Sequence, residues 1–180
     1  MPRPKPIPPE ALSLEPEDRQ RAAYVAALTM LGRRELSERQ IRQRLARKGY
    51  LDEDVDAAMV RLKAERAVDD SRVAAAIART ETSIKRRGKL RVRRQIEQAG
   101  IAPDVARQAL DAAFEDVDDD ALMAAALGRK LRGDRPIADE REFQRLYRYL
   151  AVQGFESDRI LRLLRTRRGR SDDREPDAFD

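Results

Sequence analysis

The 180-residue chain contains no cysteine, no histidine and no tryptophan. Without cysteine and histidine it has no disulfide, and no thiolate or imidazole for a metal site or for nucleophilic or general-base catalysis. Serines and carboxylates are plentiful, but no pair of them is set apart by an apolar surrounding or a neighbouring base in the sequence. We therefore expect a protein that is not an enzyme, with no catalytic residue, no metal and no cofactor.

Long apolar runs are also lacking. No stretch of about 18 apolar residues is present, and the N-terminal residues include no apolar segment of the signal-peptide type. We expect the chain neither to enter a membrane nor to be exported, and we expect it in the cytoplasm.

Aromatic residues make up only 4% of the chain, whereas charged residues make up 39%. Alanine, leucine, arginine, glutamate and aspartate outnumber the β-branched residues, which is typical of exposed helices with small aliphatic cores. The 38 basic residues are largely offset by 33 acidic ones, so the net charge of +5 permits an anionic partner without requiring one. The composition predicts an all-α protein.

The clearest helical signal lies in residues 36–59. Ser37 and Gln40 have the spacing of a capping box, in which each side chain accepts a hydrogen bond from the backbone of the other residue. Gly49 fits the left-handed position that ends a helix, and Asp52 is placed to cap the next helix. The segment is therefore predicted to be a helix-turn-helix unit.

Glycines equivalent to Gly49 recur at Gly100 and Gly154, at intervals of 51 and 54 residues. Apolar residues recur with them, four and eight residues before each glycine and again in the helix that follows it. They are Ile41, Leu45, Val55 and Met59 in the first copy, Val92, Ile96, Val105 and Leu110 in the second, and Leu146, Leu150, Ile160 and Leu164 in the third. A further amphipathic run precedes each helix pair. The pattern predicts three tandem three-helix repeats that resemble helix-turn-helix units.

Composition also places the boundaries of the repeats. Six of the nine prolines lie in the first 16 residues, which are predicted to be a disordered leader. The predicted repeats are residues 17–68, 69–117 and 118–166, and residues 167–180 are predicted to be a disordered, charged tail. Because neighbouring repeats cover one another's apolar faces, we expect a monomer.

Two short patterns imitate ligand sites and fail in detail. Gly128 and Gly133 have the spacing of a phosphate-binding loop, but Asp134 and Arg135 stand where lysine and serine or threonine are needed. The acidic run over residues 116–120 resembles the start of a calcium loop, but alanine replaces the glycine of its turn. We interpret this run as a solvated linker that caps the following helix.

Basic residues concentrate on the middle helix of each predicted repeat, most densely between Ser83 and Gly100. The last helix of the second repeat and the linker behind it are acidic instead. We predict a basic binding surface made of Arg42, Arg47, Lys48, Lys85, Arg86, Arg87, Lys89, Arg91, Arg93, Arg94, Arg145 and Arg148. Such a surface favours salt-dependent, sequence-independent binding to phosphates.

The order and spacing of several motifs resemble the RecX family, bacterial regulators of the RecA recombinase, over about residues 22–164. The motifs are Leu31 to Ser37 followed by Gln40-Ile41, Leu45 and Gly49; Val68-Asp69-Asp70 leading to Val73-Ala74; Arg87-Gly88 leading to Val92, Ile96 and Gly100-Ile101; and Leu150 with Gly154-Phe155. The sequence departs from the family pattern at Gln40, where an acid is common, and at Val73, where phenylalanine usually follows the paired acids.

This resemblance implies an elongated, curved array of three-helix repeats that binds RecA and its filament on single-stranded DNA. It also implies inhibition of ATP hydrolysis and strand exchange by RecA, in DNA repair and the SOS response. Direct binding to single-stranded or double-stranded DNA is left open. Two alternatives remain: a helix-turn-helix transcriptional regulator that reads duplex DNA, and an adaptor whose helix faces bind another protein without nucleic acid.

Overall fold

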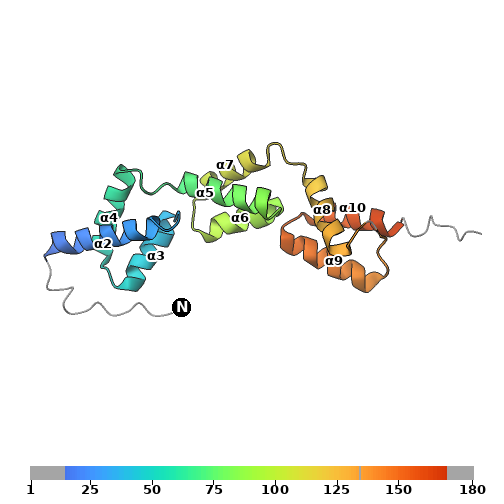
Figure 1. Ribbon diagram of the computed structural model, residues 1–180, viewed down its shortest axis with the longest axis horizontal. Helices are drawn as coiled ribbons and strands as arrows, with labels where there is room; N and C mark the ends of the chain where they lie inside the picture. Colours follow the sequence, from blue (N-terminus) through green and yellow to red (C-terminus); the bar gives the residue numbers. More distant parts are fainter. Residues whose placement is uncertain (1–14, 134, 170–180) are drawn as a thin grey trace, which may run out of the picture. The chain divides into compact units, whose positions relative to one another are not determined.

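The computed structural model describes residues 15–133 and 135–169. These residues form helices and no strand, as the composition predicted (Figure 1). The helices are α2 (Pro16–Leu31), α3 (Glu38–Lys48), α4 (Asp52–Ala64), α5 (Asp70–Arg79), the π-helix η1 (Thr80–Ile84), α6 (Lys89–Gln98), α7 (Pro103–Phe114), α8 (Asp119–Leu131), α9 (Glu140–Gln153) and α10 (Ser157–Gly169). Most of the predicted leader (1–16) and of the predicted tail (167–180) lies outside the described residues. Pro16 begins α2, however, and residues 167–169, which were predicted to belong to the tail, are the last residues of α10.

The chain divides into two compact units. The first comprises residues 1–76 and 96–109, and the second comprises residues 77–95 and 110–180. This division cuts through the second predicted repeat, so the boundaries of the three repeats remain predictions.

In the first unit, α2 packs mainly on α4, and α3 contacts both helices. The face of α2 that is fully buried carries alanines, Ala23 and Ala27, which let the two helix backbones approach closely. Arg19 of α2 pairs with the buried carboxylate of Asp54 on α4, with Nε 3.2 Å from Oδ2. The buried core contains Ala27, Leu36, Ile41, Leu45, Val55, Met59, Leu62 and Val68. Each large apolar side chain that is buried here contributes about 1.5–3 kcal/mol to folding.

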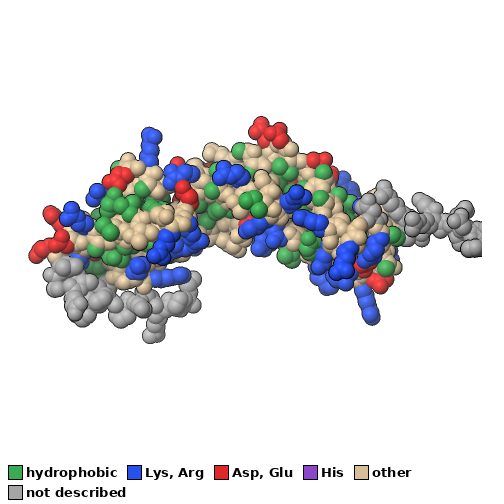
Figure 2. All heavy atoms as spheres, viewed as in Figure 1, with side chains coloured by type: hydrophobic (Ala, Val, Ile, Leu, Met, Phe, Trp, Pro, Cys, Tyr) green, Lys and Arg blue, Asp and Glu red, His purple; other side chains and the backbone are tan. Residues whose placement is uncertain are grey.

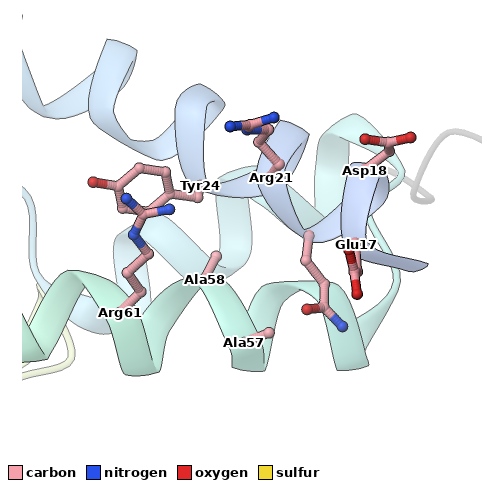
Figure 3. A pocket seen from close by; sticks show the side chains of 8 residues that line it. Glu17, Asp18, Arg21, Tyr24, Ala57, Ala58 and Arg61 are labelled. Atoms are coloured by element: carbon pink, nitrogen blue, oxygen red, sulfur yellow. The ribbon is translucent and has the colours of Figure 1, made fainter. Parts of the chain in front are cut away.

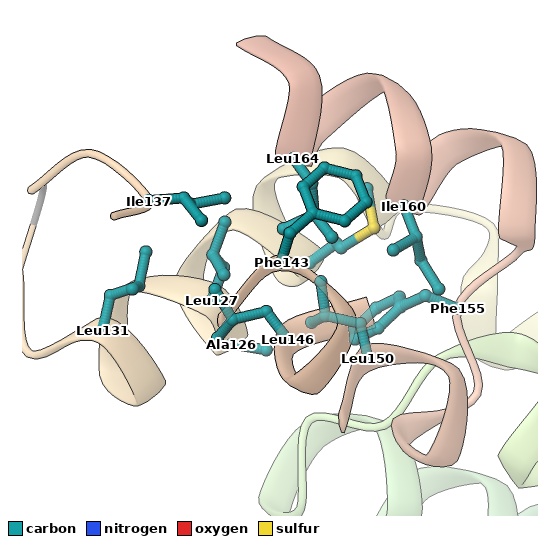
Figure 4. Packing of buried hydrophobic residues seen from close by; sticks show 11 residues of the cluster. Ala126, Leu127, Leu131, Ile137, Phe143, Leu146, Leu150, Phe155, Ile160 and Leu164 are labelled. Atoms are coloured by element: carbon teal, nitrogen blue, oxygen red, sulfur yellow. The ribbon is translucent and has the colours of Figure 1, made fainter. Parts of the chain in front are cut away.

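In the second unit, α8, α9 and α10 surround an aliphatic core to which Phe143 and Phe155 add the aromatic rings (Figure 4). The residues four and eight before each glycine, which set the predicted repeat, are all fully buried. One column needs a correction: Ala106, with 2% of its surface exposed, is buried in α7, whereas the predicted Val105 is only half-buried.

The predicted helix ends are mostly confirmed. Ser37 and Gln40 form the capping box, and Gly49 and Gly154 have φ of 92° and 95° at the ends of α3 and α9. Asp52 was predicted to cap α4, but Leu51 is the N-cap and Asp52 is the first helical residue, where its charge still favours the helix dipole. Ser157 is the first residue of α10, and its hydroxyl oxygen accepts a hydrogen bond from Tyr147 at 3.1 Å.

Gly100 and Gly154 have a second role, because the start of an earlier middle helix docks on each of them. In the first unit, Ser37 Oγ donates to the carbonyl oxygen of Ala99 at 2.5 Å, and a Cβ atom on Gly100 would lie only 2.8 Å from Cβ of Arg39. Ser37 lies twelve residues before Gly49. We call this contact, and its counterpart in the second unit, the glycine joint.

The second glycine joint uses backbone instead of a side chain. Gly88, which lies twelve residues before Gly100, donates its N–H to the carbonyl oxygen of Gln153 at 3.0 Å. Leu90 N–H donates to the carbonyl oxygen of Gly154 at 3.1 Å. A Cβ atom on Gly154 would overlap the backbone nitrogen of Arg91 and lie 2.8 Å from its Cα. The contact between a helix start and a later helix-ending glycine is therefore made at equivalent positions in both joints.

Replacing Gly154 by alanine should destabilise the protein by about 2–4 kcal/mol, because the left-handed backbone and the overlap with Arg91 both penalise a Cβ atom. Gly128, inside α8, is the matched control, since a Cβ atom there meets no atom within 4 Å. Gly128→Ala should be neutral or stabilising by up to about 1 kcal/mol. Urea unfolding followed by circular dichroism measures both, and equal stability of the two variants would contradict the joint.

Candidate functional site

The densest predicted patch begins at the π-helix η1, which follows directly after α5. Its residues Glu81 and Thr82 are buried, and their carbonyl oxygens accept the N–H groups of Arg87 and Arg86. Arg86 adopts a left-handed backbone conformation with φ of 54°. The wide π turn and the left-handed residue fold the basic stretch back on itself just before α6.

Several cations of this patch serve the structure. The Arg87 guanidinium is half-buried and donates to the side-chain oxygen of Gln153, while Arg91 is half-buried against Gly154. Lys85 pairs with Glu81 at 2.6 Å, and Lys89 pairs with Asp111 at 3.2 Å. Arg87 and Arg91, which were predicted to belong to the basic binding surface, are therefore held in the second glycine joint and are only partly exposed.

Other cations of the same stretch are accessible to solvent. Arg86, Arg93 and Arg94 are exposed. Arg86 and Arg94 have no acidic partner among the described residues. Arg94 lies six residues before Gly100, and Arg148 lies six residues before Gly154. Arg148 is also exposed and has no acidic partner in the described part of the chain, so equivalent positions carry an uncompensated cation in two repeats.

In the first repeat, too, some basic side chains are paired with acids and others are exposed. Arg42 is compensated, since it donates hydrogen bonds to Asp56 and to Glu38, and the bond to Asp56 is the main cause that raises the pKa of Arg42. Arg47 and Lys48 are exposed in the last turn of α3. Burial, with repulsion from Arg34 and Arg47, lowers the pKa of Arg44, so this end of α3 holds a cluster of cations that the prediction had not included in full.

In the third repeat, Arg145 and Arg148 line a groove of about 390 Å³ together with Arg135 and Arg141, which the sequence prediction missed. We call this the arginine groove. Figure 2 shows basic side chains gathered over the surface where α9 lies. Arg135 escaped notice because it stands in a linker, seven residues before Glu142, the residue of α9 to which its guanidinium donates.

Glu142 holds two arginine side chains of the arginine groove in place. Only 8% of its surface is exposed, and its two oxygens accept four hydrogen bonds: two from Arg135, one from Arg145 and one from the N–H of Ala138. The Arg135 bonds, followed by the Ala138 bond, lower the pKa of Glu142 to about 2. The carboxylate therefore holds two guanidinium groups in place at any physiological pH.

Acidic residues at the start of α8 pair with a cation or cap the helix. Arg159 pairs with Asp119 at 3.1 Å and with Asp120 at 2.9 Å. Burial raises the pKa of Asp119, although Arg159 opposes that rise. Asp118 is the N-cap of α8 and accepts the N–H groups of Asp120 and Ala121. The acidic run thus caps the following helix, as predicted.

A second cavity, of about 370 Å³, lies between α2 and α4 (Figure 3). The guanidinium of Arg61 stacks 3.9 Å from the centre of the Tyr24 ring, and the Tyr24 hydroxyl donates to Glu65 at 2.5 Å. That hydrogen bond is the main cause that raises the pKa of Tyr24. The cavity brings together no nucleophile and base.

Among the described residues, no group of three or more carboxylates is arranged to hold a metal ion. None of the described helices is both long and apolar enough to cross a membrane.

Comparison with known proteins assigns the family. Models of the first and second three-helix domains of RecX match residues 23–62 and 69–110. The regulatory protein RecX of Prosthecochloris aestuarii is 32% identical over 149 residues, which cover 80% of this chain and 92% of that protein. The chain belongs to the RecX family. The RecX of Halorhodospira halophila is also 32% identical, over 75% of this chain and 81% of its own length.

Other RecX proteins are longer. The chain spans 54% of the length of the Geobacillus kaustophilus RecX, to which it is 32% identical over 148 residues. Among solved structures, a regulatory protein RecX matches 84% of this chain with a TM-score of 0.66 at 23% identity, and RecX from Lactobacillus salivarius matches 83% with 0.65 at 16%. These structures support the RecX fold of tandem helical repeats.

The hydrogen bonds that Glu142 accepts predict how stability depends on pH. Because its pKa is lowered to about 2 from an ordinary 4.5, its ionised form stabilises the fold above about pH 4.5, and this contribution is lost as the pH falls towards 2. Glu142→Gln should therefore lower stability at pH 7 and flatten the acid side of the stability profile between these values. Urea unfolding across pH 2–7 measures it. A variant whose profile parallels that of the wild type would contradict the role given to Glu142.

Proposed function

We propose that this RecX-family chain regulates the RecA recombinase by binding RecA and its filament on single-stranded DNA, and thereby inhibits ATP hydrolysis and strand exchange. The observation that supports this most directly is the recurrence of exposed, uncompensated cations at equivalent positions, such as Arg94 and Arg148. Repeats in tandem that present similar surfaces suit a partner that is itself a repeated assembly, because several weak contacts then add.

The composition of the exposed surface favours phosphates or acidic protein groups as the contacted chemistry. Arg47, Lys48, Arg86 and Arg94 combine exposure with the absence of an acidic partner among the described residues. Phosphate neutralisation by such side chains is sequence-independent and weakens with salt. A regulator of a DNA-coating filament needs this kind of contact, since the DNA sequence beneath the filament varies.

The alternative of a transcriptional regulator that reads duplex DNA fits the structure less well. A recognition helix contacts bases with its N-terminal residues. The first turns of α3 and α6 are occupied by the glycine joints, and the first turn of α4 carries Asp52, Glu53 and Asp54, which would repel phosphates. No middle or last helix of the first repeat therefore offers a basic, free N-terminus for the major groove.

Reversing two open cations tests the proposal. Arg86→Glu with Arg94→Glu should weaken binding to RecA filaments on single-stranded DNA at least about tenfold, because both side chains are exposed and lie outside the glycine joint. Arg129→Glu with Arg165→Glu is the control, since it makes the same charge change at two exposed residues outside the patch. Equal affinity of the two double variants in a filament pull-down or anisotropy titration would contradict the proposed role of Arg86 and Arg94 in filament binding.

Inhibition itself is tested by ATP hydrolysis of RecA on single-stranded DNA, titrated with this protein at 50 and 200 mM salt. We expect inhibition at both concentrations, with a higher half-inhibitory concentration at high salt. Inhibition that does not change with salt would favour an adaptor that binds without charge. Tight, sequence-selective binding to duplex DNA together with unaffected hydrolysis would favour the transcriptional regulator.

A further inference from the structure

The arginine groove of the third repeat differs from the other basic surfaces because it is hollow and pre-arranged. Its lining consists of four arginines, two acids and Ala138. Both acids are already engaged: Glu142 accepts four hydrogen bonds, and Asp139, the N-cap of α9, accepts the N–H of Glu142 at 2.7 Å. Four cations against two bonded carboxylates leave the groove with an excess of positive charge.

The excess charge is carried by side chains in a fixed row. Arg141, Arg145 and Arg148 follow one another at the i, i+4, i+7 spacing and so share one face of α9. From Arg141 to Arg148 the row extends about 10 Å along the helix axis, which corresponds to about three nucleotide steps of a B-form strand. Arg141 and Arg148 contact no acid among the residues that the structure describes. Their guanidinium forks are free to bind.

The chemistry of the lining favours a phosphodiester backbone over an acidic protein surface. Protein interfaces are held by apolar or aromatic anchors in dry pockets, and the only apolar residue in the lining is Ala138. Planar guanidinium groups match the geometry of phosphate oxygens and bind them through two hydrogen bonds. No aromatic ring lines the groove to stack on a base, so the base sequence would not be read.

We infer that the arginine groove binds the sugar-phosphate backbone of a nucleic acid strand directly, with Arg141 and Arg148 contacting phosphates and Arg135 and Arg145 held in place by Glu142. This deepens the proposed function by giving the chain its own contact with DNA. It differs from the patch near α6 in needing no RecA. The two proposals are therefore tested in separate experiments and can fail separately.

The test measures anisotropy of a fluorescein-labelled 20-nucleotide oligo(dT) with the full chain and without RecA. Arg141→Glu with Arg148→Glu should raise Kd at least about tenfold at 50 mM salt. Each lost phosphate contact should also reduce the slope of log K against log salt by about 0.7, which gives about 1.4 for the pair. Arg129→Glu with Arg165→Glu changes the net charge equally at exposed residues outside the groove and should change Kd much less.

Two results would overturn the inference. One is an equal loss of affinity in both double variants, which would reduce the effect to net charge. The other is displacement of the oligonucleotide by poly-glutamate as efficiently as by unlabelled oligo(dT), which would show that phosphate is not what the groove recognises. Far-UV circular dichroism of all variants confirms that they fold alike before binding is compared.

A third variant separates positioning from contact. Glu142→Gln keeps the number of cations facing the groove but weakens the hold on Arg135 and Arg145. We expect it to weaken oligo(dT) binding by a few-fold with no decrease in the salt slope. A decrease as large as that in the Arg141 and Arg148 variant would contradict the division of roles.

Discussion

The glycine joint is the contact on which the arrangement of the repeats depends. A helix that ends in a left-handed glycine turns its last backbone groups outward, and the missing Cβ leaves room for a second backbone to approach. The start of an earlier middle helix uses that room twice, through Ser37 on Ala99 and Gly100, and through Gly88 on Gln153 and Gly154. One residue type at one position thus both ends a helix and connects two repeats. Loss of either property would affect the whole array, since each repeat is small.

Much of the fold could be predicted from the sequence because it depends on local signals. The capping box at Ser37, the left-handed turn at Gly154 and the buried columns such as Leu45 follow from spacing alone. The joints could not be predicted, because Ser37 and Ala99 lie 62 residues apart and no local pattern links them. The π-helix was missed for a related reason, since its polar residues are buried by tertiary contacts and carry no apolar period.

The candidate site shows the limit of counting charges along a sequence. A dense basic run predicted a binding surface, yet Arg87 and Arg91 are used in a joint and Lys85 is paired with Glu81. Conversely, Arg135 contributes to the arginine groove from a linker, which its sequence neighbours gave no reason to expect. What decides whether a cation is available is its partner in space. In this chain a pattern of equivalent positions, such as Arg94 and Arg148, was more informative than local density.

The third repeat treats the joint position differently. Ser37 and Gly88 stand immediately before their helices, twelve residues ahead of the glycines that end them, but the same offset from Gly154 falls on Glu142, the third residue of α9. The position that enters a glycine joint in the first two repeats is here held by a carboxylate that already accepts four hydrogen bonds. The longer start of α9 therefore ties this position to the linker of its own repeat, through Arg135 and Ala138, and gives the arginine groove its fixed side.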